Sequence, residues 1–141
     1  MEPPTKPLSV VPIIGPRLLL VDDDETVVSA LADFLRSRYY EVETAGHGAE
    51  ALAMAREKRP ALILLDIQLP GMDGLTVMRT LRQDLDPSLA AVPIIALTAL
   101  AMPGDRERCL AAGATDYLPK PVELERLAQA IDALLSQSGT S

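Results

Sequence analysis

Residues 61–74 have the sequence ALILLDIQLPGMDG, and this stretch decides the fold. It opens with the most continuously apolar run of the chain, residues 61–65, and that run ends at a single acid, Asp66. A buried parallel strand is a nearly continuous run of Val, Ile and Leu, because both of its faces are covered. The loop LPGMDG contains the turn residues Pro70, Gly71 and Gly74. The stretch therefore predicts the central strand of a parallel sheet over residues 61–66.

An apolar run followed by a polar residue occurs three more times. Asp22 and Asp23 follow LLLV. Thr98 follows IIAL, and Lys120 follows DYLP. In open α/β sheets, ligands bind beyond the carboxyl ends of the strands, so these side chains are expected to meet Asp66 at one edge of one sheet. Together they could hold a metal ion, an anionic group and a nucleophile.

Hydrophobic periodicity places the remaining elements. Strands are expected over 18–21, 40–44, 61–66, 92–97 and 115–118, and helices over 24–38, 48–58, 75–83, 103–112 and 122–135. Pro103 is expected in the first turn of its helix, which Gly113 ends. The helices at 48–58 and 103–112 are weakly amphipathic. Strands that alternate with helices predict an α/β domain, a five-stranded parallel sheet with helices on both faces.

Composition limits the function. The chain has 141 residues, 48% of them hydrophobic and only 3% aromatic, which fits one domain with an aliphatic core. Its formal net charge of −7 argues against electrostatic capture of nucleic acid or of an anionic membrane. No run approaches the ~20 apolar residues that a membrane-spanning helix needs. The single cysteine, Cys109, excludes an internal disulfide and is interpreted as a small helix residue.

The chain divides into three parts. Residues 1–16 carry five prolines and are predicted to be a flexible arm, in which VVPII is an apolar patch that could bind other surfaces. Residues 17–136 are predicted to form the domain, and residues 137–141 a disordered tail. The N-terminus lacks a basic segment followed by an uninterrupted apolar stretch, so it is not a signal peptide. A cytoplasmic location is expected.

Three consecutive acids follow the first strand. One acid is enough to cap the helix that begins there, and we assign Asp24 to that task. Adjacent carboxylates repel one another unless a cation or protons compensate, so Asp22 and Asp23 are interpreted as a metal site. Oxygen ligands favour Mg²⁺, and no Cys/His cluster favours zinc.

The polar residues at the other strands suit phosphoryl chemistry. A carboxylate beside a divalent cation stays ionised, and carboxylates such as Asp66 can form aspartyl-phosphates. Thr98 offers a hydroxyl, and Lys120 a compact charge that can pair with Asp66 before transfer and with the phosphoryl group afterwards. Pro121 is a candidate for a cis peptide bond.

At this point the sequence resembles the response regulator receiver domain of bacterial two-component signalling. The resemblance covers roughly residues 17–135 and rests on LLLVDDDE, LILLDIQLPGMDG, PIIALTA and AGATDYLPKP, in this order and spacing. It implies a flavodoxin-like, doubly wound sheet of three-layer (βα)5 type with strand order 2-1-3-4-5. It also implies a module that assists its own phosphorylation and dephosphorylation and is otherwise not an enzyme.

The resemblance implies a role for each site residue. Asp66 becomes the phosphoacceptor, and Asp23, Asp66 and the Gln68 carbonyl bind Mg²⁺, with Asp22 acting mainly through water. The Thr98 hydroxyl, the Ala99 amide and Lys120 hold the phosphoryl oxygens, and Tyr117 is the switch aromatic that turns inward when Thr98 moves. The implied donor is a sensor histidine kinase or a histidine phosphotransfer protein. Output is expected from the surface formed by residues 103–112, 115–118 and 122–135, which can bind a partner or a second copy of the chain.

Two other functions remain open from the residues alone. An Mg²⁺ hydrolase of the aspartyl-phosphate type often has a second acid two residues after its nucleophile, where this chain has Gln68. A flavin-binding electron carrier would need a Ser/Thr/Gly-rich phosphate loop where this chain has DDDE, which would repel a phosphate. Within the favoured family, the chain is either a free-standing regulator or a receiver from a larger hybrid kinase. Leu100 is apolar and cannot orient an attacking water, so slow autodephosphorylation is expected.

Overall fold

The computed structural model describes residues 15–99 and 102–139. Most of the predicted N-terminal arm, Leu100 and the last two residues of the predicted tail lie outside these ranges. The strands are β1 (Arg17–Val21), β2 (Glu41–Ala45), β3 (Leu62–Asp66), β4 (Ile94–Thr98) and β5 (Asp116–Pro119). The helices are α2 (Glu25–Ser37), α3 (Gly48–Lys58), α4 (Gly74–Arg82), α5 (Pro87–Ala90), α6 (Asp105–Ala112) and α7 (Leu124–Gly139).

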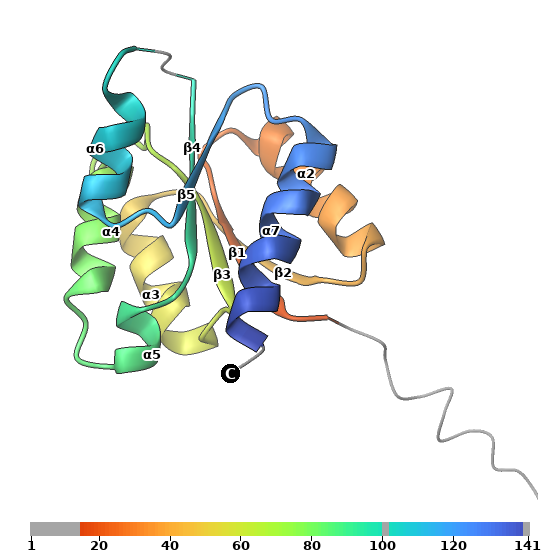
Figure 1. Cartoon of the computed structure of the whole chain (residues 1–141), viewed down its shortest axis with the longest axis horizontal. Helices are drawn as coiled ribbons and strands as arrows, with labels where there is room; N and C mark the ends of the chain where they lie inside the picture. The colour runs from red at the N-terminus through yellow and green to blue at the C-terminus, as the bar shows by residue number, and fades with distance from the viewer. Residues whose placement is uncertain (1–14, 100–101, 140–141) are drawn as a thin grey trace, which may run out of the picture.

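The five strands form one parallel sheet in the order β2-β1-β3-β4-β5, which confirms the expected topology (Figure 1). The central strand β3 pairs with β1 on one side and with β4 on the other, and all five of its residues are buried. Pairing between β1 and β2 extends back to Pro16, whose carbonyl accepts a hydrogen bond of 3.2 Å from the Glu41 amide. All the carboxyl ends of the strands therefore meet at one edge of the sheet.

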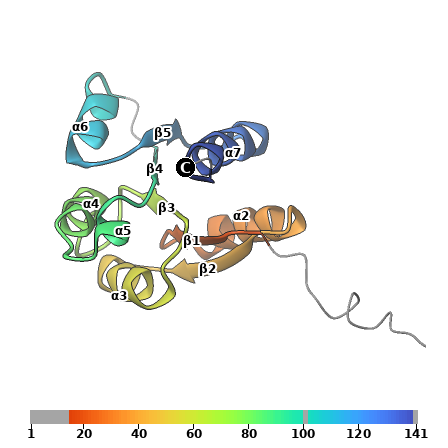
Figure 2. The same cartoon turned by 60° about the horizontal axis from the view of Figure 1, so that its bottom comes forward.

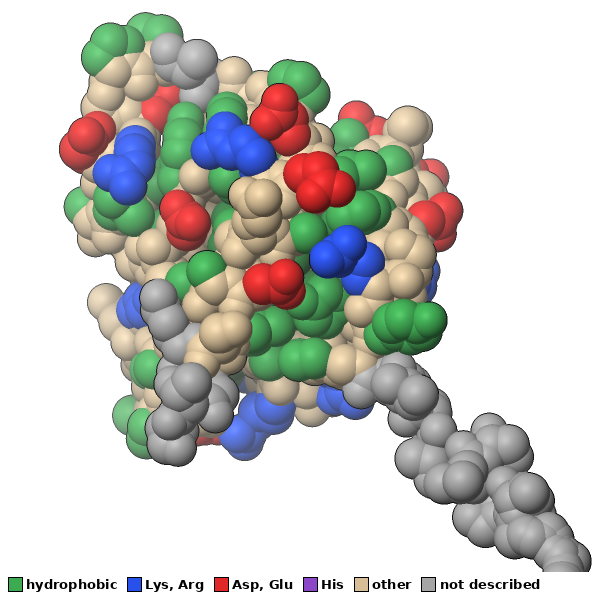
Figure 3. All heavy atoms as spheres, turned by 45° about the vertical axis from the view of Figure 1, so that its right-hand side comes forward, with side chains coloured by type: hydrophobic (Ala, Val, Ile, Leu, Met, Phe, Trp, Pro, Cys, Tyr) green, Lys and Arg blue, Asp and Glu red, His purple; other side chains and the backbone are tan. Residues whose placement is uncertain are grey.

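Helices cover both faces of the sheet and make three layers (Figure 2). Helices α3, α4, α5 and α6 lie on one face, and α2 and α7 lie on the other. Figure 3 shows the side of the molecule on which α2 and α7 lie, where exposed hydrophobic side chains are interspersed with acidic and basic ones. In the described part of the chain, no helix is both long and apolar enough to cross a membrane.

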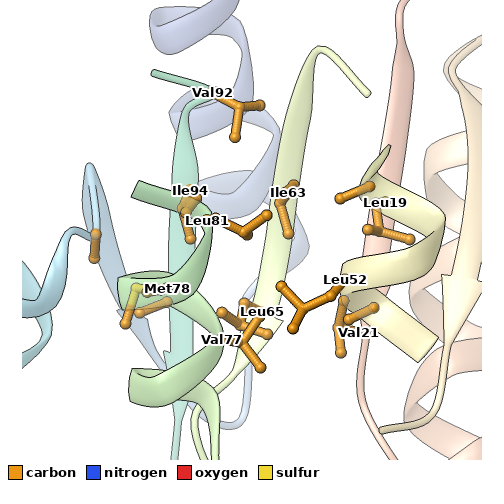
Figure 4. Packing of buried hydrophobic residues seen from close by; sticks show 14 of the residues in the cluster. Leu19, Val21, Leu52, Ile63, Leu65, Val77, Met78, Leu81, Val92 and Ile94 are labelled. Atoms are coloured by element: carbon orange, nitrogen blue, oxygen red, sulfur yellow. The ribbon is translucent and has the colours of Figure 1, made fainter. Parts of the chain in front are cut away.

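The alternation of side chains along the strands divides the core in two. Leu19, Ile63 and Ile94 point toward α3 and α4, where they pack with Val77, Met78 and Leu81 (Figure 4). The neighbouring strand residues, such as Leu18 and Leu64, pack on the other face against Leu31 and Leu35 of α2 and Leu127 and Ile131 of α7. Both clusters are almost entirely aliphatic, as the scarcity of aromatic residues predicts. Cys109 is free and buried in the first cluster, in agreement with its predicted role.

Three features of the helices differ from the predictions. The short helix α5, capped by Asp86, was not predicted, because four residues are too few to show a hydrophobic period. Helix α6 begins at Asp105, so placing Pro103 in its first turn was wrong. Gly104 has a φ of 90° and separates the proline from the helix. Helix α7 continues to Gly139 rather than ending at Leu135, because no proline or earlier glycine interrupts the sequence SQS.

Candidate phosphoacceptor site

The loop after β1 holds two of the predicted acids in different environments. Asp22 is 2% exposed, and its Oδ1 accepts a hydrogen bond of 2.9 Å from the Asp24 amide. Asp23 is exposed. The Asp24 side chain accepts hydrogen bonds from the amides of Thr26 and Val27, which confirms that this residue caps α2. The sequence DDD thus separates into a buried acid, an exposed acid and a helix cap.

Asp66 is the last residue of β3 and is 3% exposed. Its Oδ1 accepts a hydrogen bond of 3.0 Å from the Gln68 amide. The following loop folds back on the end of the strand, because the Gly74 amide donates to the Ile67 carbonyl at 2.9 Å. A Cβ atom at Gly74 would lie 2.6 Å from the Asp66 carbonyl oxygen, so only glycine allows this close approach.

Lys120 follows β5 and reaches across the edge of the sheet. Its Nζ lies 2.7 Å from Oδ2 of Asp22 and 3.3 Å from Oδ2 of Asp66. The Lys120 amide donates to the Thr98 carbonyl at 2.8 Å, which anchors the backbone next to β4. The Lys120–Pro121 peptide bond is cis, as the sequence suggested. One ammonium therefore contacts two carboxylates that come from different strands.

The pocket is strongly acidic. Ligand oxygens of Asp22, Asp23 and Asp66 all lie within 4.8 Å of one another. Burial raises the pKa of Asp66, as does the nearby charge of Asp22, while the Gln68 amide and Lys120 act in the opposite direction. Burial alone would lower the pKa of Lys120, but its contacts with Asp22 and Asp66 outweigh burial and raise it.

Thr98 and Tyr117 lie on the neighbouring strands β4 and β5 and point to the same face of the sheet. Thr98 ends β4 and is 2% exposed. Tyr117 is in register with Ala96, and both pack against the core cluster on the side of α3 and α4. Because side chains alternate along a strand, Thr98 points to the same face as Ala96 and thus lies diagonally across from Tyr117. Ala99 is exposed and lines a groove together with Lys120.

The structure thus brings together four of the residues that the sequence singled out, Asp22, Asp23, Asp66 and Lys120, and adds two contacts. Sequence reasoning paired Lys120 with Asp66 and did not foresee its shorter contact with Asp22. It also gave no backbone donor to Asp66, although the amide two positions after an Asp is a common partner for its side chain. The position of Gln68, two residues after Asp66, was the signal that could have suggested this second contact.

The donor set fits a hard divalent cation. Three carboxylates and one ammonium leave an excess of two negative charges, and the oxygen ligands that they offer are those that Mg²⁺ prefers. Both oxygens of Asp22 already accept hydrogen bonds, from the Asp24 amide and from Lys120. The exposed Asp23 is the more accessible ligand, whereas Asp66 is buried and its two oxygens contact the Gln68 amide and the Lys120 ammonium.

The fold and the acidic pocket define a receiver-type α/β domain. The family model of the response regulator receiver domain matches residues 18–132, and the chain belongs to this family. The chain is 48% identical over 107 residues to the response regulator PleD of Caulobacter vibrioides. It is 39% identical over 121 residues to the polar-differentiation response regulator DivK of Brucella anthropi.

These relatives differ in length. The match covers 76% of this chain and only 23% of PleD, whereas with DivK it covers 86% of this chain and 97% of DivK. A solved structure, the receiver domain of the sensor histidine kinase PA1611 from Pseudomonas aeruginosa PAO1, has a TM-score of 0.79 and 38% identity. That match covers 86% of this chain and 98% of the other, which has a magnesium ion coordinated in its active-site cleft.

Proposed function

We propose that this chain is a phosphoacceptor module of a two-component system or phosphorelay. In this proposal, Asp66 accepts a phosphoryl group from a phosphohistidine donor in an Mg²⁺-dependent reaction. The main support for this proposal is the surroundings of the buried Asp66 carboxylate. The Lys120 ammonium lies 3.3 Å from it, and ligand oxygens of two further acids lie within 4.8 Å. Family membership supports the same role.

The chain's residues would contribute positioning and charge. A carboxylate oxygen of Asp66 forms the new bond to phosphorus, the bond from phosphorus to the donor's imidazole nitrogen breaks, and that nitrogen takes up a proton. A bound Mg²⁺ would supply positive charge against the phosphoryl oxygens. Lys120, the Thr98 hydroxyl and the Ala99 amide would hold those oxygens, because phosphoryl transfer is catalysed mainly by positioning and charge neutralisation.

The metal ligands in this proposal are Asp23, Asp66 and the Gln68 carbonyl, with Asp22 acting through water. The hydrogen bonds that Asp22 already accepts support its indirect role. Gln68 is within reach, because its amide bonds to Asp66.

The output would arise from movement of Thr98 toward the phosphoryl group, followed by an inward turn of Tyr117. Their placement on the same face of the sheet supports this coupling. The changed surface would be that of α6, β5 and α7, which binds a downstream partner or a second copy of the chain. Phosphorylation would act by shifting the population between two arrangements of this surface.

We propose a protein donor, namely a sensor histidine kinase or a histidine phosphotransfer protein. A groove of about 550 Å³ opens next to Lys120, between α2 and the start of α7. It is lined mainly by apolar residues of α2 and of the segment after β5 (Val27, Ala30, Leu31, Ala99, Lys120, Pro121, Val122 and Leu124). A small phosphodonor is too small to cover this apolar groove, whereas a helix of a protein donor can pack against it. The acidic net charge fits a protein partner in the cytoplasm better than nucleic acid.

Mass spectrometry after incubation with acetyl phosphate and Mg²⁺ tests this function. The native chain is expected to gain the mass of one phosphoryl group and Asp66→Asn none. Equal gain by both proteins, or no gain by the native chain, would contradict the proposal. Steady release of phosphate from many added substrates would instead favour a hydrolase.

A further inference from the structure

One buried acid has no role in the chemistry proposed above. In the described part of the chain, the buried polar or charged residues are Asp22, Asp66, Thr98 and Asp105. The first three belong to the phosphoacceptor site. Asp105 is the first residue of α6 and is only 3% exposed. A carboxylate is costly to bury unless its partners are in place, so its contacts should be informative.

The Asp105 carboxylate points back toward the segment between β4 and α6. Its Oδ2 accepts a hydrogen bond of 2.9 Å from the Met102 amide, and its Oδ1 pairs with the guanidinium of Arg108. The Asp105 amide in turn donates to the Met102 carbonyl at 3.1 Å. Gly104 makes no side-chain capping bond. Asp105 thus connects the start of α6 to Met102 through both its side chain and its backbone.

The same carboxylate lies near the proposed switch residue. Burial is the main reason why the pKa of Tyr117 is raised, and the charge of Asp105 raises it further. Tyr117 packs against the core cluster that contains Cys109, which is one helical turn after Asp105. Asp105 therefore bonds to Met102, in the connection after β4, and its charge acts on Tyr117, the other residue that the proposed switch would have to move.

We propose that Asp105 is a positioning residue that holds the domain in its unphosphorylated arrangement; this inference rests on the proposed function. Ala99 and Met102 both lie in the connection between β4 and α6, so a shift of Ala99 toward the phosphoryl group acts on the same connection that Asp105 holds at Met102. Moving the Met102 amide would leave a buried carboxylate without one of its donors, which is unfavourable. Asp105 therefore opposes the shift, and removing it favours the phosphorylated arrangement.

The test measures binding of fluoroberyllate, BeF₃⁻, a mimic of the phosphoryl group, in the presence of Mg²⁺ by NMR titration. Asp105→Ala is expected to bind BeF₃⁻ more tightly than the native chain, by about threefold to tenfold. The Tyr117 ring signals of ligand-free Asp105→Ala should shift toward their position in the BeF₃⁻ complex. Asp105→Asn keeps an oxygen for the Met102 amide and should show an intermediate affinity.

Asp86→Ala is the matched control. Asp86 also accepts a hydrogen bond from a backbone amide at a helix N-terminus and pairs with an arginine, Arg59, but the helix that it caps is α5. Its replacement should leave BeF₃⁻ affinity unchanged. The inference would be overturned if Asp105→Ala bound BeF₃⁻ no more tightly than the native chain. If Asp105→Ala does not fold, an affinity of Asp105→Asn for BeF₃⁻ equal to that of the native chain would overturn it. Failure of the native chain to bind BeF₃⁻ would instead contradict the proposed function.

Discussion

Lys120 and Asp22 are 98 positions apart in the chain, yet the Lys120 ammonium lies 2.7 Å from Oδ2 of Asp22. The Asp22 side chain is fully buried, and that of Lys120 is 19% exposed. The contact joins the ends of β1 and β5, with β3 and β4 lying between them in the sheet. The ammonium offsets only one of the three carboxylate charges in the pocket, and the excess negative charge is the basis of the first prediction.

Neutralising one acid should stabilise the metal-free protein and weaken its response to metal. Asp23→Asn is expected to unfold at a higher temperature than the native chain in EDTA, because repulsion between neighbouring carboxylates is reduced. Mg²⁺ at a hundred times its dissociation constant should stabilise the native chain by about 2.7 kcal/mol and the variant much less. Thermal unfolding with and without Mg²⁺ measures both effects. An equal response of the two proteins to Mg²⁺ would rule out Asp23 as a ligand.

A charge in the apolar groove should separate protein donors from small ones. Ala30 is an exposed residue of α2 that lines the groove beside Lys120. Ala30→Glu should slow transfer from a histidine phosphotransfer protein about tenfold, because binding would bury an unpaired charge, and should leave phosphorylation by acetyl phosphate unchanged. Ala53→Glu, on the exposed side of α3, is the control and should affect neither rate. Equal transfer rates for Ala30→Glu and the native chain would show that the donor does not use this groove.

The lifetime of the phosphorylated protein should be long. Leu100 lies outside the described residues, so this prediction rests on its apolar side chain, which cannot hydrogen-bond an attacking water. Loss of radiolabelled phosphate from the purified protein should take minutes or longer, and Leu100→Asn should shorten this time. A half-life of seconds for the native protein would count against the prediction.

One hydrogen bond should make stability depend on alkaline pH. The Tyr40 hydroxyl donates to Oδ1 of Asp132 at 2.8 Å, and burial, together with this bond, raises the pKa of Tyr40 from 10.0 to about 12. When a group has a higher pKa in the folded state, it contributes its full stabilisation at pH values below its pKa in the unfolded state. This stabilisation is lost as the pH rises through the pKa in the folded state. The free energy of unfolding of the native chain relative to Tyr40→Phe should therefore be constant below pH 10.0 and fall toward pH 12.

Spectrophotometric titration of the phenols checks the same assignment. Tyr40→Phe should remove a group that titrates near pH 12. If the variant instead loses a group that titrates near pH 10, the Tyr40 phenol is not held by Asp132.

The sequence was most informative where a residue type could serve only one purpose. The buried run that ends at Asp66 predicted the central strand, and the parallel order of the sheet then required Asp22, Thr98 and Lys120 to share its edge. Asp24 was correctly assigned as a cap, because three consecutive acids are more than a helix start needs. These predictions depend on topology and alternation, which the local sequence encodes.

The unpredicted features depend on contacts between distant segments. Asp105 looks like an ordinary acid in the first turn of a helix, and only the fold places it near Met102 and Tyr117. Likewise, nothing in the sequence around Arg82 distinguishes it from a surface residue of α4, but its guanidinium donates to the carbonyls of Ala90, Val92 and Gly113. No local pattern indicates such a partner, because the acceptors are backbone atoms of any residue type.

Trapping the acyl phosphate tests the central claim most directly. After incubation with acetyl phosphate and Mg²⁺, borohydride reduces an aspartyl-phosphate to homoserine, and peptide mass spectrometry locates the change. Homoserine is expected at position 66, and unaltered aspartates at positions 22 and 23. Conversion at either of those positions, or no conversion at position 66, would contradict the claim.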